Sequence, residues 1–380
     1  GGLGDVYKRQ DEIYSAQALL SEKGFQVNNF KQGDLSLKVK GDNSYEKYNV
    51  DLSLTHNASQ SIFANGDVDF SATRPELKNF IVRLDKFQLN AFSPLGQDIL
   101  TRVRGVASGE FNVSGFLGNP VMNGEITLKD AGLKFPYLNV DYDFKGLTKI
   151  SLEDQSFTFN QLTLQDVKYG TLGDFSGRIS HLNFKDWFLN LKINTDNLLV
   201  LDTEDTEESL YYGTAFIKGD ASIVGLTSSL QIDVNAKTNA NTVFVLPLSD
   251  LKTVDNYSLI HFDKVIKSID DAKSQFAVNT PKGLTLNINL ELTKEATAEI
   301  VIDKKTGSSL TGNGTGDIQL KIDTRGGFSM FGDYIVDKGK YEFKNSGINR
   351  TFEVEKGGTI SWNGDPTDAN LNVTAIYVAK

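Results

Sequence analysis

Apolar and polar residues alternate with a period of two along most of the chain. The longest perfect run is Leu284–Leu292, in which every second residue is leucine or isoleucine. Side chains of a strand point alternately to its two faces, so each run predicts a strand with one apolar face. Because the other face is polar, the pattern favours half-buried antiparallel strands over the fully buried strands of a parallel sheet.

The apolar positions of these runs are the candidate functional residues, because together they could line one continuous groove. They are Leu230, Ile232, Val234, Leu284, Leu286, Ile288, Leu290, Ile318, Leu320, Ile322, Leu371 and Val373. Such faces must pack against a second sheet, a barrel wall, a bilayer or a bound apolar ligand. Most runs are shorter than the ~9–11 residues of a transmembrane barrel strand. We therefore expect a sandwich, or one sheet curled lengthwise on itself.

Short segments rich in Gly, Asn, Asp and Pro separate the runs and predict hairpin turns. They are Asn65-Gly66, Gly118-Asn119-Pro120, Asn123-Gly124, Gly307-Ser308, residues 312–316, Asp337-Lys338-Gly339 and Asn363-Gly364-Asp365-Pro366. Helical spacing is scarce and predicts short helices at 11–23, 93–102 and 258–271. The expected fold class is all-β, an elongated antiparallel sheet curled into a groove, with a few short helices.

Composition narrows the function more than the fold. Lys and Arg number 39 against 49 Asp and Glu, and the net charge of -10 disfavours nucleic-acid partners. The chain has no cysteine, which excludes disulfides and thiolate chemistry and suits an oxidising compartment. The longest uninterrupted apolar stretches, 198–201 and 243–246, fall far short of the roughly 18 residues of a membrane-spanning helix.

No constellation of catalytic or metal-binding residues emerges from the spacing. The histidines His56, His181 and His261 stand far apart and lack companion ligands. The acidic run at 202–208 lacks the glycine and terminal glutamate of an EF-hand loop, so we expect a solvated loop. Residues 312–316 lack the Lys-Ser/Thr of a phosphate-binding loop. We expect no enzymatic activity, cofactor, metal or small-molecule substrate.

Two stretches resemble the TamB family. Residues 105–115 and 116–128 place two Gly-led strands on either side of a Gly-Asn-Pro turn, as in a TamB repeat. The second stretch, at 332–377, is more specific and resembles the hallmark segment of the TamB C-terminal domain. Its marker residues are Gly357, Gly358, Trp362, Gly364, Asp365 and Pro366. Trp362 is expected to be a packing anchor. Residues 166–170 and 177–184, in the middle of the chain, resemble the Bacteroidota branch of the family.

The resemblance implies a lengthwise-folded antiparallel sheet with an apolar interior, called a β-taco. It also implies a periplasmic location in a Gram-negative bacterium, with an inner-membrane anchor supplied by an N-terminal segment absent from this fragment. The implied partners are an outer-membrane barrel of the TamA or BamA type and phospholipid acyl chains. The implied roles are translocation and assembly of outer-membrane and secreted proteins, and phospholipid transfer between the membranes.

Three parts are expected along the chain. Residues 1–10 lack an initiator Met and look like translated adapter sequence, so we interpret them as a non-native extension. Residues 11–100 carry strand repeats with one short helix, and residues 101–380 form a TamB-type domain truncated at its end. The alternatives are a dry core with no ligand, and a surface β-solenoid adhesin or structural protein, which the irregular turn spacing disfavours.

Overall fold

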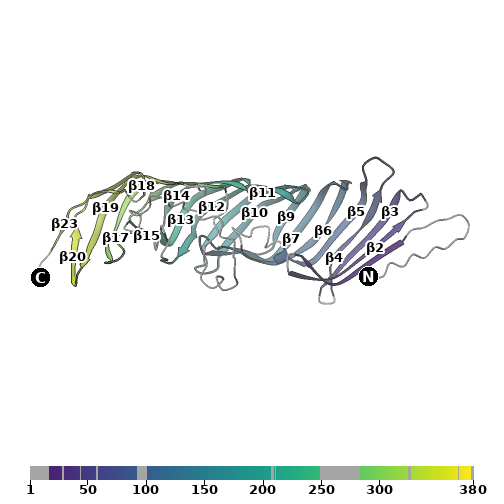
Figure 1. Ribbon diagram of the computed structural model, residues 1–380, viewed down its shortest axis with the longest axis horizontal. Helices are drawn as coiled ribbons and strands as arrows, with labels where there is room; N and C mark the ends of the chain where they lie inside the picture. Colours follow the sequence, from purple (N-terminus) through teal and green to yellow (C-terminus); the bar gives the residue numbers. More distant parts are fainter. Residues whose placement is uncertain are drawn as a thin grey trace, which may run out of the picture. The chain divides into compact units, whose positions relative to one another are not determined.

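The computed structural model describes residues 17–27, 30–42, 44–56, 59–91, 101–206, 209, 211–248, 283–323, 327–366 and 368–377. In these residues 23 β-strands are assigned to one sheet (Figure 1). The described residues contain no α-helix and only a single 3₁₀ turn, at 89–91. The all-β fold class is therefore confirmed.

The strands are, in chain order, β1 (Gln17–Val27), β2 (Phe30–Gly41), β3 (Lys47–His56), β4 (Ser59–Asp69), β5 (Glu76–Gln88), β6 (Thr101–Phe116), β7 (Asn119–Phe135), β8 (Val140–Phe144), β9 (Thr148–Asp154), β10 (Ser156–Asp166), β11 (Leu172–Leu182), β12 (Lys185–Thr203), β13 (Tyr212–Leu226), β14 (Ser229–Thr238), β15 (Val243–Pro247), β16 (Leu284–Leu292), β17 (Thr297–Asp303), β18 (Ser308–Asp323), β19 (Gly327–Asn345), β20 (Ile348–Val354), β21 (Thr359–Gly364), β22 (Asn370–Asn372) and β23 (Ala375–Ile376). The chain divides into two compact units. Unit 1 comprises residues 1–133, 143–163 and 175–190, and unit 2 comprises residues 134–142, 164–174 and 191–380.

Unit 1 is an antiparallel sheet with one apolar face. The register of β2 to β5 aligns Leu37 with Leu52, Leu52 with Ala64, and Ala64 with Val82. Directly paired residues point to the same face, so this row is apolar, whereas the neighbouring row, Lys38–Asp51–Asn65, is polar on the opposite face. The buried core of the unit continues the apolar face across β6, β7 and β9.

Unit 2 departs from a purely antiparallel sheet at two pairings. β14 runs parallel to β16, and β15 runs parallel to β17. A parallel pair cannot be joined by a tight hairpin, and residues 239–283 separate β14 from β16 along the chain. β15 and β17 continue β14 and β16 beyond short breaks, so the two parallel pairs share one strand order.

The long strands of unit 2 change partners partway along their length. β19 pairs with β21 through residues 330–335 and with β20 through residues 339–345. β18 pairs with β16 through 316–323 and with β17 through 308–313. Asp337 is an extra residue at the change, where the register shifts between Asn313 and Gly314.

The partner changes align into what we call the fold line, which consists of residues 239–242, 293–296, 313–314, 337 and 355–358. Hydrogen bonds connect its segments: the Thr297 amide donates to the Thr242 carbonyl at 2.8 Å, and the Val336 amide donates to the Gly358 carbonyl at 2.8 Å. The Asn313 side-chain amide donates to the Ala296 carbonyl at 2.8 Å. On one side of the line lies wall A, formed by residues 217–226 of β13, β14, β16, β21, residues 316–323 and residues 327–335. Wall B, on the other side, is formed by β15, β17, β20, residues 308–313 and residues 339–345.

The structure corrects one predicted helix and several predicted turns. Residues 17–23 of the predicted helix 11–23 belong to β1, which pairs with β2. Residues 101–102 of the second helix begin β6, and the third helix, 258–271, lies outside the described residues. The remaining parts of the first two helices, 11–16 and 93–100, also lie outside them.

Some of the predicted turns are confirmed and others are wrong. Gly118-Asn119, Gly307-Ser308 and Gly364-Asp365 lie at strand ends, as expected. Four segments lie inside strands instead: Asn65-Gly66 in β4, Asn123-Gly124 in β7, 312–316 in β18 and Asp337-Lys338-Gly339 in β19. The reason is close approach, because a Cβ at Gly66 would lie 2.4 Å from the Cα of Phe80. Glycine at these positions admits a neighbouring backbone and does not reverse the chain.

Candidate functional site

The register of unit 2 brings the predicted residues of β14, β16 and β18 onto one face. Two rows across the strands are Ala221–Val234–Ile288–Leu320–Met330 and Ile223–Ile232–Leu286–Ile322–Phe328. A third row is Ala236–Leu290–Ile318–Gly332–Trp362, and Leu230 pairs with Leu284 at the strand ends. We call this surface the inner face of wall A.

The opposite face of the same strands is polar and hydrogen-bonded from strand to strand. The Asn287 amide donates to Asp233 at 2.8 Å, and the Asn289 amide donates to Asn235 at 2.8 Å. Gln319 of β18 donates in turn to Asn289 at 3.1 Å. Polar ladders of this kind suit a solvated face, so the sheet has a wet side and an apolar side.

Burial is uneven along the inner face of wall A. Leu230, Ile318, Met330 and Trp362 are buried, whereas Ile232, Val234, Leu286, Ile288, Leu290, Leu320 and Ile322 are only half-buried. In β18, burial decreases from Ile318 to Leu320 and Ile322, moving away from the fold line. The predicted residues therefore form an apolar surface that stays partly accessible.

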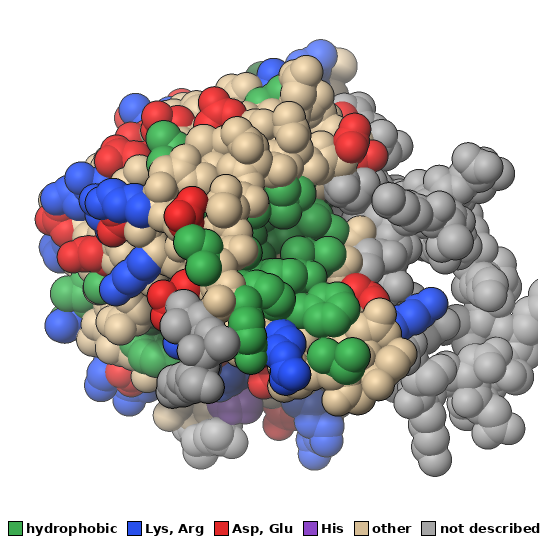
Figure 2. Space-filling model, turned by 90° about the vertical axis from the view of Figure 1, so that its left-hand side faces the viewer, with side chains coloured by type: hydrophobic (Ala, Val, Ile, Leu, Met, Phe, Trp, Pro, Cys, Tyr) green, Lys and Arg blue, Asp and Glu red, His purple; other side chains and the backbone are tan. Residues whose placement is uncertain are grey.

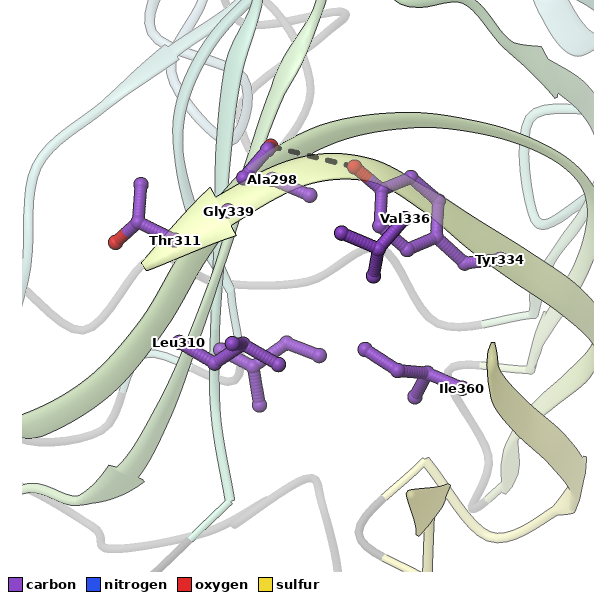
Figure 3. A pocket seen from close by; sticks show the side chains of 9 residues that line it. Ala298, Leu310, Thr311, Tyr334, Val336, Gly339 and Ile360 are labelled. Carbon is purple, nitrogen blue, oxygen red and sulfur yellow. Dashed lines mark hydrogen bonds between the residues drawn. The ribbon is translucent and has the colours of Figure 1, made fainter. Parts of the chain in front are cut away.

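Close to the fold line the two walls pack together. The buried core of unit 2 combines Ile318, Tyr334 and Ile360 of wall A with Leu310 and Ile300 of wall B. The remaining cavity between them is about 10 Å³, barely the space of one water molecule (Figure 3). In this part of unit 2 the apolar side chains of the two walls pack tightly against each other.

Tyr334 bridges the two walls at this point. Its hydroxyl donates to the Gly312 carbonyl at 3.2 Å, as the dashed line in Figure 3 shows. Burial raises the pKa of Tyr334 to about 12, so the hydroxyl keeps its proton at physiological pH. The ring lies over Gly314, where a Cβ would come within 2.8 Å of the Tyr334 Cζ atom. Gly314 thus makes space for the ring.

The hallmark segment builds the closing edge of this core. Gly357 and Gly358 lie in the fold line, and the Gly357 amide donates to the Val336 carbonyl at 2.8 Å. Trp362 is 6% exposed, stands across from Gly332 in the paired strand, and donates its indole N–H to the Pro366 carbonyl at 3.1 Å. Its surroundings are those of a packing anchor. Gly364, Asp365 and Pro366 follow at the end of β21.

The last two predicted groove residues are separated by the structure. Val373 is half-buried, packs against the core of unit 2 and lies close to Gly358, where an added Cβ would approach Val373 Cγ1 to 2.9 Å. Leu371 pairs with Ile360 but is 37% exposed in the short strand β22. Leu371 therefore lies at the margin of the apolar surface.

Hydrophobic side chains are visible from the end of unit 2 that carries β19 to β23. Figure 2 shows them gathered in a recess near the middle of this face, with most of the Lys, Arg, Asp and Glu side chains to its left, above and below it. Apolar side chains are therefore exposed at this end.

β19 contributes inner-face residues that the sequence pattern did not predict. Phe328, Met330, Tyr334 and Val336 alternate along the strand and face the same side as the predicted residues. Gly332 interrupts their apolar pattern. If glycine is allowed at an apolar position of the alternating pattern, the sequence predicts this run of inner-face residues in β19.

The carboxylates at the fold line and in the acidic run form ion pairs with lysines. Asp337 contacts Lys356 at 2.6 Å and Lys294 at 3.5 Å, and these two ammonium groups, Lys356 first, lower the pKa of its carboxyl. In the acidic run, Asp202 pairs with Lys168 at 2.5 Å and Asp205 with Lys304 at 2.9 Å. Among the described residues no group of three or more potential ligands could hold a metal ion.

The fold and this surface define a class of protein: an all-β protein whose sheet carries a continuous apolar face and a polar reverse side. A sequence profile of the TamB C-terminal domain matches residues 160–380, which is more than half of the chain. The chain therefore belongs to the TamB family. No curated protein matches it, and no solved structure does.

The family sets the general context of the chain. TamB proteins are non-enzymatic, envelope-associated modules that span the periplasm, are associated with TamA, and act in outer-membrane protein assembly or lipid transport. The described part of the chain contains no helix that is long and apolar enough to cross a membrane.

Proposed function

We propose that the inner face of wall A carries phospholipid acyl chains across the periplasm. The observation that supports this proposal is the set of apolar rows that crosses β13, β14, β16, β18 and β19 without a charged residue. Five strands at roughly 4.8 Å spacing give a row about 19 Å long. One acyl chain fills half of a hydrocarbon core of about 30 Å, so the row is long enough to cover it.

The energetic need for such a surface is large. Exposing a CH₂ group to water costs ~0.8 kcal/mol, so a sixteen-carbon chain costs about 12 kcal/mol and a two-chain lipid about 25 kcal/mol. A half-buried apolar row lowers this cost at every position, and the absence of polar anchors along it lets the chain slide. The polar head group stays in water outside the sheet.

A matched pair of substitutions in β16 tests the proposal. Ile288→Asp places a carboxylate on the inner face, whereas Asn289→Asp places one on the polar face of the adjacent position. We expect the wild type and Asn289→Asp to retain phospholipid through gentle purification, as measured by native mass spectrometry and lipid extraction. Ile288→Asp should lose most of it while keeping the same circular dichroism spectrum. Equal lipid retention by the two variants, or none by the wild type, contradicts the proposal.

A second candidate function is assembly of outer-membrane proteins by strand addition. β22 pairs with β21 and β23 pairs with β20, and all described residues of these two short strands are exposed. An exposed strand edge is a template for a further strand, such as one from a TamA-type or BamA-type barrel.

Substitutions that introduce charges into the edge strand β22 distinguish this candidate function from lipid transfer. Asn370→Lys with Asn372→Lys should weaken binding of a purified barrel of this type, measured by titration, because lysines on an edge strand oppose strand addition. Lipid retention should stay at the wild-type level. Unchanged binding would exclude this edge as the docking strand.

A further inference from the structure

A row of exposed apolar side chains follows the hairpin turns at one edge of unit 1. The turns join β2 to β3, β4 to β5, β6 to β7, and β11 to β12, and each exposes at least one large apolar side chain. Their exposed fractions lie between 40% and 56%. The residues are Tyr45, Phe70, Phe116, Leu117, Leu182 and Phe184, and we call them the apolar rim.

Hydrogen bonds connect these turns to one another. The Phe70 amide donates to the Glu46 carbonyl at 2.6 Å, and the Leu117 amide donates to the Pro75 carbonyl at 2.8 Å. Gln155, between β9 and β10, receives the Asn183 amide at 2.6 Å and donates to the Asn119 side chain. The turns therefore form one connected edge, and the rim is a continuous feature instead of scattered apolar residues.

The rim is continuous with the apolar face of unit 1. Phe70 packs edge-to-face on Tyr48 at 5.5 Å between ring centroids, and Tyr48 pairs with the buried Val68. At the other end, Phe184 stacks on His181 at 4.3 Å, and His181 contacts Phe157 at 5.7 Å. Phe157 in turn packs against the core of the unit.

Charges of both signs accompany the rim. The Arg74 guanidinium lies over the Phe116 ring at 5.6 Å from its centroid, and Phe116 pairs with Glu76 of the neighbouring strand. Lys185 is exposed next to Phe184 and is followed by the exposed Asp186. An apolar lip with cations and carboxylates beside it complements a molecule that carries acyl chains and a zwitterionic head group with a phosphodiester.

We propose that the apolar rim is a lateral entrance through which a phospholipid enters unit 1 with its acyl chains first. The acyl chains cross the rim onto the apolar face while the phosphate stays beside Arg74 or Lys185. The inference rests on the proposed function for the identity of the ligand, but it assigns the place of entry, which an end-to-end path does not require.

The test compares loading rates of two triple variants. The rim variant is Phe70→Ser/Leu117→Ser/Phe184→Ser, and the control is Ile81→Ser/Val224→Ser/Ile335→Ser, which removes three exposed apolar side chains from polar faces. All six positions are exposed, so both variants should fold. The probe is a fluorescent phosphatidylcholine, supplied either as a short-chain monomer or in vesicles of phosphatidylethanolamine and phosphatidylglycerol.

We expect the rim variant to load about tenfold more slowly from both sources, equivalent to roughly 1.4 kcal/mol of barrier, and to reach the wild-type amount of bound lipid. The control should load like the wild type. Slowing from vesicles alone would overturn the entrance and assign the rim to membrane adsorption, and equal rates for all three proteins would overturn it outright. Absence of loading by the wild type would instead refute the proposed function itself.

Discussion

A substitution at Gly332 tests whether the close approach of β18 and β19 determines the stability of unit 2. The φ of Gly332 is +124°, and a Cβ there would lie 2.0 Å from the Asp317 carbonyl oxygen in β18. A strained backbone position costs about 1–3 kcal/mol, and overpacking against a fixed neighbour costs about 1–3 kcal/mol more. Gly332→Ala should therefore lower the free energy of unfolding of unit 2 by roughly 2–6 kcal/mol.

The chain contains its own reporter for this measurement. Of its two tryptophans, Trp362 pairs with Gly332 in unit 2 and Trp187 lies in unit 1. In a Trp187→Phe background, urea unfolding followed by tryptophan fluorescence reports on unit 2 alone. Gly327→Ala in the same strand is the control, because a Cβ there meets nothing within 4 Å. If the two variants agree within about 0.5 kcal/mol, the close approach of β18 and β19 does not limit stability.

Two further predictions concern buried polar groups. Asp166 is 1% exposed, and its carboxylate accepts hydrogen bonds from the backbone amides of Lys168, Tyr169 and Thr171 at 3.0, 2.7 and 2.6 Å. Asp166→Ala should therefore lower the free energy of unfolding of unit 2 by about 3 kcal/mol, measured by urea unfolding. Asp166→Asn should give a smaller loss. Burial lowers the pKa of His181 below 6.5, so the unfolded chain binds a proton first as the pH falls. The stability of unit 1 should therefore be level above about pH 6.5 and decline below it, as measured by Trp187 fluorescence, and His181→Phe should remove that decline. A decline of equal size in His181→Phe would assign the pH dependence to another group.

The period-two alternation predicted the apolar face because it is a local property. Leu286 and Ile288 point to the same side of β16 whatever strand lies beside them. Their alignment with Ile232 and Val234 in β14 was not predictable, because it depends on a parallel pairing between strands that are distant in the sequence. Register between distant strands is a non-local property that no single run of residues encodes.

Glycine and short helical patterns were the main sources of error. Gly66 and Gly124 have the composition of a turn, and only the neighbouring strand shows that the backbone approaches them closely. Leu19 and Leu20 fit a helical spacing, yet pairing with β2 determines the conformation of residues 17–27. Local propensity yields to strand pairing when a long partner is available.

The dry-core interpretation and the lipid-path interpretation apply to different parts of the same surface. At the fold line, Ile360 is 1% exposed and the cavity beside it is about 10 Å³, so the side chains there serve packing alone. Farther along the same strands Leu320 and Ile322 face the same side but remain half-buried. A sheet that packs tightly at the fold line and keeps the middle of β14, β16 and β18 half-buried combines a stable core with a partly accessible apolar surface. The proposed path for acyl chains therefore uses only the rows away from the fold line, which is why Ile288 and not Ile360 is the position to charge.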